Sequence, residues 1–589
     1  MGIASSAEAA RGSMSRDGSG TAHSIREAQI FGPEWLRLPI LTLGHLGSHY
    51  VWSILNARAA LFLMRLGIPK SVTSVVLIAG PLSGLLVQPA VGILSDVCAS
   101  RWGRRRPYIL GGVVLCISAL VCLAAASSVA RIHGTLTSVL GIVLGILGIV
   151  SIDVSINALS AAHRALILDM LHADEQDLAN AWATRFSNLG SVMGYLVGDL
   201  DLSNGLALDQ LSVLTLSAVV LLAVTHVSLF VLLDEPLFPA PDAGRARGVY
   251  SAVRELFLHL YHTGQRLPPP VLDLFKIQFF SWLAWFPVLY YSSSWVAEIY
   301  RAAHPQDGGL NEAARRTGSF ALLCNALVSL AASVVLPWCL YDVMPASARA
   351  HRYAPASSTV WAAEGAEDAV EQPAAPKADG RGTLRWVRRL RAPTMPEAWL
   401  ASQVLFSVSL LFFTCPIQSA SSVAGAVALV GVLGLCWALT LWAPYALLGI
   451  LLNTQRAPVL RTDAGAEALA PVGAADEPAE AEATLRTQAG TVMGLHNWSI
   501  VLPQLVTSVV SSLCTCYEAN AVFSLPALVW DAPTAASFDS TGLLFRVGSL
   551  CTLVAAVRTV RWIRAYDTPA GALLLPPRGA PDPDYVELT

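Results

Sequence analysis

Long apolar runs separated by polar segments dominate this chain. Each run holds about 20 residues or more, the length that an α-helix needs to cross a hydrocarbon core of about 30 Å. The pattern predicts an all-α polytopic membrane protein with twelve transmembrane helices in two six-helix bundles. That layout is typical of transporters whose binding site lies between two halves, although other folds also have twelve spans. The predicted helices are residues 36–57, 72–96, 107–130, 137–168, 177–199, 210–233, 272–297, 316–337, 398–416, 422–453, 488–514 and 540–562.

Polar segments divide the apolar runs into two halves. These segments are rich in Ser, Ala, Gly, Pro or Glu, so they hold too little apolar surface to form a packed core and are expected to be disordered. The predicted organisation is a cytoplasmic tail (1–33), an N-terminal six-helix bundle (34–233), a cytoplasmic linker (234–271), a C-terminal six-helix bundle (272–563) with cytoplasmic insertions at 342–397 and 462–484, and a second cytoplasmic tail (564–589).

Composition narrows the class of protein further. Hydrophobic residues make up 54% of the chain and charged residues only 13%, against about 25% charged in soluble proteins. The net charge of −3 gives no basic field for nucleic acid. The 10 cysteines are dispersed, with neither metal-ligand nor disulfide spacing. No nucleophile–base pair, metal cluster or phosphate-binding glycine loop stands out. We therefore expect neither an enzyme nor a metal-binding or nucleic-acid-binding protein.

Arginine residues set the expected orientation of the helices. Lys and Arg collect in cytoplasmic loops, and four arginines lie in the loop that follows the helix at 72–96. Five more lie after the helix at 316–337, between residues 381 and 391. The loop at 299–316 carries three arginines and is a weaker signal of the opposite sign. The balance favours both chain termini on the cytoplasmic side.

The helix at 137–168 carries ionisable groups inside an apolar segment, where each costs at least about 2.5 kcal/mol. Relative to Asp153, Asn157 lies at about 40° and Arg164 at about 20° around the helix. These side chains share one stripe, which we expect to face a polar cavity because lipid cannot satisfy them. Asp153 and Arg164 are about 16 Å apart along the axis, which suits a substrate or water chain lying between them. Fixed contacts with neighbouring helices are the alternative.

A second group of charges lies at the predicted cytoplasmic end. The segment DVCASRWGRRRPYI (96–109) brings Asp96 close in sequence to Arg104, Arg105 and Arg106. Asp169 falls at about 160° from Asp153, off the polar stripe, and is a candidate partner for these arginines. We expect an ion-paired latch that holds the cytoplasmic side shut in one conformation. The arginines also have a simpler explanation, which is topology alone.

Other polar and aromatic residues are candidates for substrate contact. Asn188 lies in the helix at 177–199, and Asn497 and Gln504 share one face of the helix at 488–514. The helix at 272–297 is rich in aromatic residues, among them Trp285 and Tyr290. Aromatic rings of this kind stack on sugar rings, but they also form interfacial belts in membrane proteins. Both interpretations remain open for these two residues.

Several segments resemble the sucrose transporters, a group within the glycoside-pentoside-hexuronide:cation symporters of the major facilitator superfamily. The most specific is GPLSGLLVQPAVGILSDVCASRWGRRRPYILGG (80–112), and the wording of the later segments is more similar to the fungal members. The other segments are SIDVSINALSAAHRALILDM (151–170), NAWATRFSNLGSVMGYLVGDLDL (180–202), WFPVLYYSSSWVAEIY (285–300), TGSFALLCNALVSL (317–330), WAPYALLG (442–449) and GTVMGLHNWSIVLPQ (490–504).

This resemblance implies the major facilitator fold and proton-coupled import of sucrose or a related glucoside such as maltose. The family's proton-carrying aspartate stands eleven residues before an arginine, and Asp153 and Arg164 match that spacing. Asn157 matches the family's asparagine on the same helix. The proton is then the coupling ion, and no other cofactor is implied. The partners implied are a small sugar and the lipid bilayer, with the plasma membrane favoured over the vacuolar membrane; no sequence feature favours a particular oligomeric state.

The first helix departs from the family pattern. Relatives have Thr-Pro-Tyr where Ala60 to Phe62 stand, fungal members have a glutamate near Leu55, and Arg58 is an added charge. Plant members also have histidine where Lys70 stands and Asp-Thr-Asp where this chain has serines at 292–294. These differences leave two alternatives to a proton symporter. One is an uncoupled sugar facilitator, and the other is a transport-inactive sugar sensor.

Overall fold

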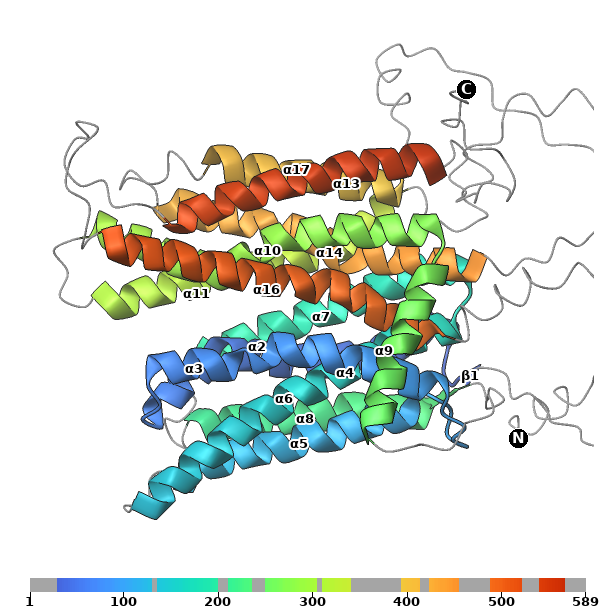
Figure 1. Cartoon of the computed structure of the whole chain (residues 1–589), viewed down its shortest axis with the longest axis horizontal. Helices are drawn as coiled ribbons and strands as arrows, with labels where there is room; N and C mark the ends of the chain where they lie inside the picture. Colours follow the sequence, from blue (N-terminus) through green and yellow to red (C-terminus); the bar gives the residue numbers. More distant parts are fainter. Residues whose placement is uncertain are drawn as a thin grey trace, which may run out of the picture.

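The fold is almost entirely helical in the computed structural model (Figure 1). Apart from two short strands and one 3-10 turn, the elements are helices that run side by side in two groups. The structure describes residues 29–129, 135–199, 210–235, 249–304, 310–340, 393–413, 423–454, 488–521 and 540–566.

The N-terminal half contains the six predicted spans. Two of these begin with an extra short helix, because the chain bends between α1 and α2 and between α3 and α4. The elements are α1 (Glu34–Thr42), α2 (Gly44–Arg65), α3 (Lys70–Leu77), α4 (Ala79–Asp96), α5 (Arg106–Val129), α6 (Thr135–Met170), the 3-10 turn η1 (Ala173–Glu175), α7 (Gln176–Asp199) and α8 (Gln210–Leu232).

The C-terminal half contains the other six predicted spans. In Figure 1 this half, coloured green to red, lies against the blue-to-teal N-terminal half along the lengths of α7, α4 and α16. Its long helices are α10 (Pro269–Ala303), α11 (Leu310–Cys339), α13 (Met395–Phe413), α14 (Val423–Thr454), α16 (Ala489–Ala521) and α17 (Ser540–Tyr566).

The apolar character of these helices agrees with a membrane location. In the part of the chain that the structure describes, 7 helices are long and apolar enough to cross a bilayer by length and composition: α5, α6, α8, α10, α11, α14 and α17. Among the remaining long helices, α7 and α16 carry several of the polar residues that lie between the halves. The prediction of an all-α polytopic membrane protein is confirmed.

Each half has its own apolar core, and one core reaches across the boundary. One cluster of buried side chains lies wholly within residues 41–233. A second is made of C-terminal residues around Trp399 and Trp442, and it also takes in Leu168 and Ala181 from the N-terminal half. The two halves are therefore packed directly against each other at the level of these two residues.

Two short stretches depart from the sequence-based expectation of disorder. Residues Gln29–Ile30 form a strand, β1, which pairs antiparallel with β2 (Leu233–Asp234) and so joins the two ends of the N-terminal half. The linker at 234–271 contains a helix, α9 (Val249–Arg266). The helix has a buried apolar face. The average composition of the whole linker is polar, so it does not reveal this local apolar surface. The tail at 1–28, nearly all of the insertion at 342–397, the whole of 462–484 and most of the second tail lie outside the described residues.

Candidate functional site

Asp153 lies at the junction of three helices from both halves. Its carboxylate is half-buried on α6, and a Cβ atom built on Gly80 of α4 would lie 3.6 Å from both carboxylate oxygens. The hydroxyl of Tyr290, on α10, is close enough to Asp153 to interact electrostatically with its carboxylate. Among the described residues, no donor hydrogen-bonds to the carboxylate and no cation pairs with it. Asp153 is thus a carboxylate without a fixed partner, located between the halves.

Asn157 and Asn497 join α6, α4 and α16. The Asn157 amide donates to Ser83 Oγ at 2.8 Å and accepts from Gln88 Nε2 at 2.7 Å. The Asn497 amide donates across the boundary between the halves to the Gly84 carbonyl at 2.7 Å. Both predicted residues therefore face the same junction, where their amides are engaged with α4 in this conformation.

Arg164 is a buried cation held by neutral groups. Only 9% of the residue is exposed, and its guanidinium donates to Asn180 Oδ1 of α7 at 3.0 Å. The same group lies over the ring of Tyr445 of α14, 3.7 Å from the ring centroid. No carboxylate within the described ranges pairs with it. Tyr445 was not singled out in the sequence analysis, where it appeared only inside the segment WAPYALLG.

The remaining predicted contact residues fall in different environments. Gln504 donates a hydrogen bond to the Tyr290 hydroxyl, and Tyr290 is 43% exposed, so the structure brings these two together on an accessible surface. Asn188 is buried on α7, and its amide nitrogen has no hydrogen-bond partner among the described residues. Trp285 lies in the C-terminal core, where it donates to Thr440 and packs against other aromatic rings.

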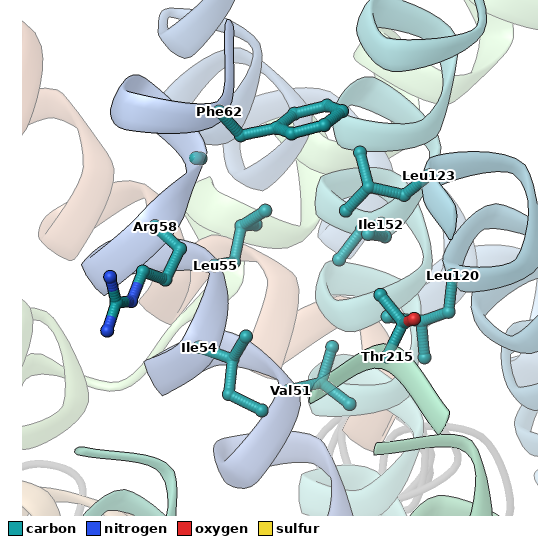
Figure 2. A pocket seen from close by; sticks show the side chains of 10 residues that line it. Val51, Ile54, Leu55, Arg58, Phe62, Leu120, Leu123, Ile152 and Thr215 are labelled. Carbon is teal, nitrogen blue, oxygen red and sulfur yellow. The ribbon is translucent and has the colours of Figure 1, made fainter. Parts of the chain in front are cut away.

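An apolar pocket inside the N-terminal half lies beside the polar stripe but does not include it. Figure 2 shows the Arg58 guanidinium directed away from the apolar side chains at the centre of this pocket. The added charge of the first helix therefore does not enter it, and an apolar lining of this kind does not suit a sugar. The lining residues are Val51, Ile54, Leu55, Arg58, Ala59, Phe62, Leu120, Leu123, Ile152 and Thr215.

The arginine loop forms the ion pairs that its sequence suggests. Arg104 and Arg105 both contact the Asp169 carboxylate, at 2.5 and 2.8 Å, and Arg105 also pairs with Asp96 at 2.6 Å. All four side chains are almost completely buried. The positive-inside rule predicts that this cluster lies at the cytoplasmic end. Its role as a gate stays a prediction.

Asp96 also reaches across the boundary between the halves. Its carboxylate accepts hydrogen bonds from the backbone N–H groups of Gly490 (3.0 Å) and Thr491 (2.8 Å), at the start of α16. A helix N-terminus has free N–H groups and a partial positive charge, so it stabilises a carboxylate at this position. The Gly92 backbone touches that of Gly490, with no room for a side chain between them.

Glu235, which the sequence analysis missed, stabilises the arginine loop by accepting hydrogen bonds from its backbone. Its buried carboxylate accepts hydrogen bonds from the backbone N–H groups of Arg104 and Arg105 at 2.8–2.9 Å and of Arg106 at 3.1 Å. Gly103, with φ of +98°, makes the tight turn in contact with this carboxylate. Burial, together with the nearby Asp169 charge, raises the pKa of Glu235 to about 7.

Arg106 ties the same loop to the end of α8. Its guanidinium pairs with Asp234 at 3.3 Å and donates to the Phe230 carbonyl at 2.6 Å.

A second contact crosses the boundary between the halves. The indole of Trp442 (α14) donates a hydrogen bond to the Asp177 carbonyl (α7) at 2.8 Å. Two separate contacts, α4 with α16 and α7 with α14, therefore join the halves at this end of the bundle.

Three comparisons with known proteins agree with this architecture. Residues 41–251 match the family described as MFS/sugar transport protein. The chain is 29% identical to the general alpha-glucoside permease of Schizosaccharomyces pombe over 81% of its own length and 86% of the permease. It is 29% identical to the sucrose transport protein SUT3 of Oryza sativa subsp. japonica, over 50% of this chain and 62% of that protein. The solved structure of a human organic anion transporter shares the fold, with a TM-score of 0.51 at 13% identity over 90% of this chain and all of that one.

The structure has the fold of the major facilitator transporters, and the relatives that the chain matches are membrane transporters rather than enzymes. The chain is similar to sugar transport proteins, and the sequence resemblance to the sucrose and α-glucoside transporters is confirmed. In the described part of the chain, no group of three His, Cys, Asp or Glu side chains is arranged to hold a metal ion.

Proposed function

We propose that this protein carries sucrose, or a related α-glucoside such as maltose, across the membrane together with a proton. The names of its relatives support the substrate class. The observation that carries the proposal is the pair of unmatched charges on α6. Among the residues that the structure describes, no cation pairs with the Asp153 carboxylate and no carboxylate pairs with the Arg164 guanidinium, and both groups lie on one helix face between the halves.

Asp153 supplies the coupling step in this mechanism. A partly buried carboxylate is unfavourable when ionised and unpaired, so binding a proton from the acidic side neutralises it before the halves move. A neutral Asp153 next to Gly80 and Tyr290 then leaves a site suited to uncharged sugar hydroxyls. After the movement, the higher pH of the cytoplasm removes the proton. A membrane potential of 100 mV adds about 2.3 kcal/mol per proton carried.

Arg164 supplies substrate binding. Its guanidinium has five N–H donors and does not exchange its proton, so it suits sugar hydroxyl oxygens rather than proton transfer. Asn157, Asn188, Asn497 and Gln504 provide further amide groups, and Tyr290 offers an accessible ring. Trp285 lies in the core in this conformation, so contact with sugar at that residue requires a rearrangement of α10.

Alternating access follows from the cytoplasmic seal. Rocking of the two halves separates Asp96 from the N-terminus of α16 and Tyr445 from Arg164, which opens the site toward the cytoplasm. The Arg104–Arg105–Asp169 cluster keeps the loop intact within the N-terminal half during this movement. Uptake of external sugar requires the plasma membrane, which is the location that we propose.

The direct test is uptake of labelled sucrose and maltose by yeast that lacks its own sugar transport. Wild type and Asp153→Asn are compared at pH 5 and pH 7.5, with Asp273→Asn as the control because Asp273 is an exposed carboxylate paired with Lys276. We expect strong uptake at pH 5, weak uptake at pH 7.5, and loss of uptake only in Asp153→Asn. Uptake that is insensitive to pH and to the mutation indicates a facilitator instead. Sugar binding without uptake indicates a sensor.

A further inference from the structure

Helix α9 crosses the boundary between the two halves near their cytoplasmic ends. In Figure 1 it is the green helix that runs across the ends of the other helices, in front of α4 and α16. It contacts both of these helices, one from each half. These are the same two helices that Asp96 joins at the cytoplasmic seal. The linker helix therefore lies directly over the seam between α4 and α16.

One face of α9 is fixed to this seam. Leu260 and Thr263 are buried, and the Thr263 hydroxyl donates to Gln488, just before α16 begins. At the edge of this face, the ring centroid of the partly exposed Phe257 lies 6.5 Å from that of Trp498. The Trp498 indole in turn donates to the Leu85 carbonyl of α4 at 2.9 Å.

These contacts give α9 a depth in the membrane. Trp498 is nine residues into α16, or about 13 Å from its cytoplasmic end at 1.5 Å per residue. Thr263 contacts the end itself, so α9 slopes inward from Thr263 toward Phe257. Leu86, next to the Leu85 carbonyl, is 45% exposed, which marks a lipid-facing apolar surface at the same level. With the cytoplasmic end of α16 at the membrane surface, this level corresponds to the boundary between lipid headgroups and acyl chains.

That outer face is aromatic, apolar and basic. Phe257, Leu258 and Tyr261 are 45%, 38% and 61% exposed, and they fall within about 100° around the helix axis. His262 and Arg266 are exposed next to Leu258, about 40° and about 80° further around the helix and away from Phe257. Aromatic rings with flanking cations are the composition of helices that lie in the membrane interface, where the rings sit at headgroup level and the cations meet anionic lipid.

We propose that the face of α9 formed by Phe257, Leu258 and Tyr261, with Arg266 at its edge, binds the cytoplasmic leaflet, with anionic headgroups as its preferred ligands. The continuity of this face with the exposed apolar surface of α4 favours a lipid surface over a protein partner. The anionic lipids of the cytoplasmic leaflet attract Lys and Arg side chains that lie near the membrane surface. The proposal does not depend on which sugar is carried. It makes α9 a lipid-bound helix that crosses the seam between α4 and α16.

Photo-crosslinking in lipid nanodiscs tests this surface on the full chain. Benzoylphenylalanine is placed at position 257 or 261, and at the exposed loop position of Arg101 as a control. Mass spectrometry then counts lipid adducts in discs of phosphatidylcholine with and without phosphatidylserine. We expect abundant lipid adducts at 257 and 261, several-fold more than at 101, with phosphatidylserine over-represented.

A second variant separates the headgroup preference from general lipid contact. Arg266→Gln is expected to remove the enrichment of phosphatidylserine adducts at 261 while total lipid adducts remain. Adduct yields at 257 and 261 no higher than at 101 overturn the proposal, as do adducts to a second copy of the chain in place of lipid. Equal use of the two lipids in the wild type overturns the preference for anionic headgroups.

Discussion

The guanidinium carbon of Arg164 lies 3.7 Å from the centre of the Tyr445 ring, across the boundary between the two halves of the protein. Arg164 belongs to α6 and Tyr445 to α14, so the contact exists only while these helices are close together. A buried cation over an aromatic face is worth about 2 kcal/mol or more when it is desolvated. In this conformation the ring holds the group that we assign to sugar binding.

Replacement of Tyr445 tests the importance of this contact. Tyr445→Leu removes the π face, and we expect sugar uptake to fall by roughly thirtyfold, as a loss of about 2 kcal/mol predicts. Tyr445→Phe keeps the ring and is expected to retain most of the activity. Concentration-dependent uptake assays measure both variants. Equal activity of the Leu and Phe variants would show that the ring has no such role.

The Asp96 carboxylate is predicted to hold the cytoplasmic seal. Asp96→Asn removes the charge that meets Arg105 and the N-terminus of α16, and loss of one member of a buried ion pair costs about 3–5 kcal/mol. A cysteine at Ala181, which is buried between the halves, reports opening through its reaction with a membrane-impermeant maleimide added from the cytoplasmic side. We expect at least about tenfold faster labelling in Asp96→Asn.

The exposed pair of Asp273 and Lys276 provides the control for that experiment. Asp273→Asn removes one carboxylate from the same protein without touching the seam, so its labelling rate should equal that of the Ala181→Cys parent. If Asp96→Asn labels no faster than Asp273→Asn, the seal does not depend on Asp96.

Close backbone contact at Gly92 gives a second test of the seal. A side chain at this position would overlap the Gly490 backbone, and overpacking of this kind costs about 1–3 kcal/mol. We expect Gly92→Ala to favour the open cytoplasmic side and to speed labelling of the same cysteine. Gly111→Ala is the matched control, because nothing lies within 4 Å of the added atom. Identical labelling of the two alanine variants contradicts the packing shown here.

Glu235 predicts a dependence on cytoplasmic pH. In the sealed state its pKa is raised from 4.5 to about 7. We expect that loss of the contact between Asp96 and α16 on opening admits water to the folded loop and returns the pKa toward its ordinary value. The sealed state therefore binds the proton more tightly. Acidification of the cytoplasmic side through pH 7 stabilises the seal, and this stabilisation is lost as the pH rises through about 7. Two-state linkage predicts that the ratio of sealed to open protein is on the order of tenfold higher at pH 6 than at pH 8.

The Ala181→Cys reporter measures this effect on inside-out vesicles. Labelling should be slower at pH 6 than at pH 8, after correction for the reactivity of a free thiol at each pH. Glu235→Gln should remove most of that difference, and Glu312→Gln, an exposed acid near the start of α11, should leave it unchanged. A pH dependence that survives Glu235→Gln rules out this carboxylate as its source.

The parts of the fold that sequence could predict are those encoded locally. Each apolar run is long enough to define a helix by itself, so all twelve predicted spans correspond to long helices in the structure. The stripe of Asp153 and Arg164 follows from the helical period alone. The ion pairs of the arginine loop were expected because Asp96 and Asp169 are acids at the same end of the bundle, where the arginines need partners.

The parts that sequence analysis missed depend on contacts between distant segments. Tyr445 meets Arg164 through the packing of two helices, which no single-helix period reveals. Glu235 follows the end of α8. Its hydrogen bonds form only when the loop after α4, which is distant in sequence, folds against it. Trp285 and Tyr290 belong to one aromatic-rich helix, and residue type alone does not separate the ring that packs in the core from the ring that is accessible.

The most direct test of the account is proton movement during sugar uptake. Sucrose or maltose is added to energy-depleted yeast cells that express the protein in a weakly buffered medium, and the external pH is recorded. Proton coupling through Asp153 predicts alkalinisation of the medium on sugar addition in the wild type, and none in Asp153→Asn when that variant is equally abundant at the cell surface. Sugar uptake by the wild type without any change in external pH, or alkalinisation that persists in Asp153→Asn, would contradict the account.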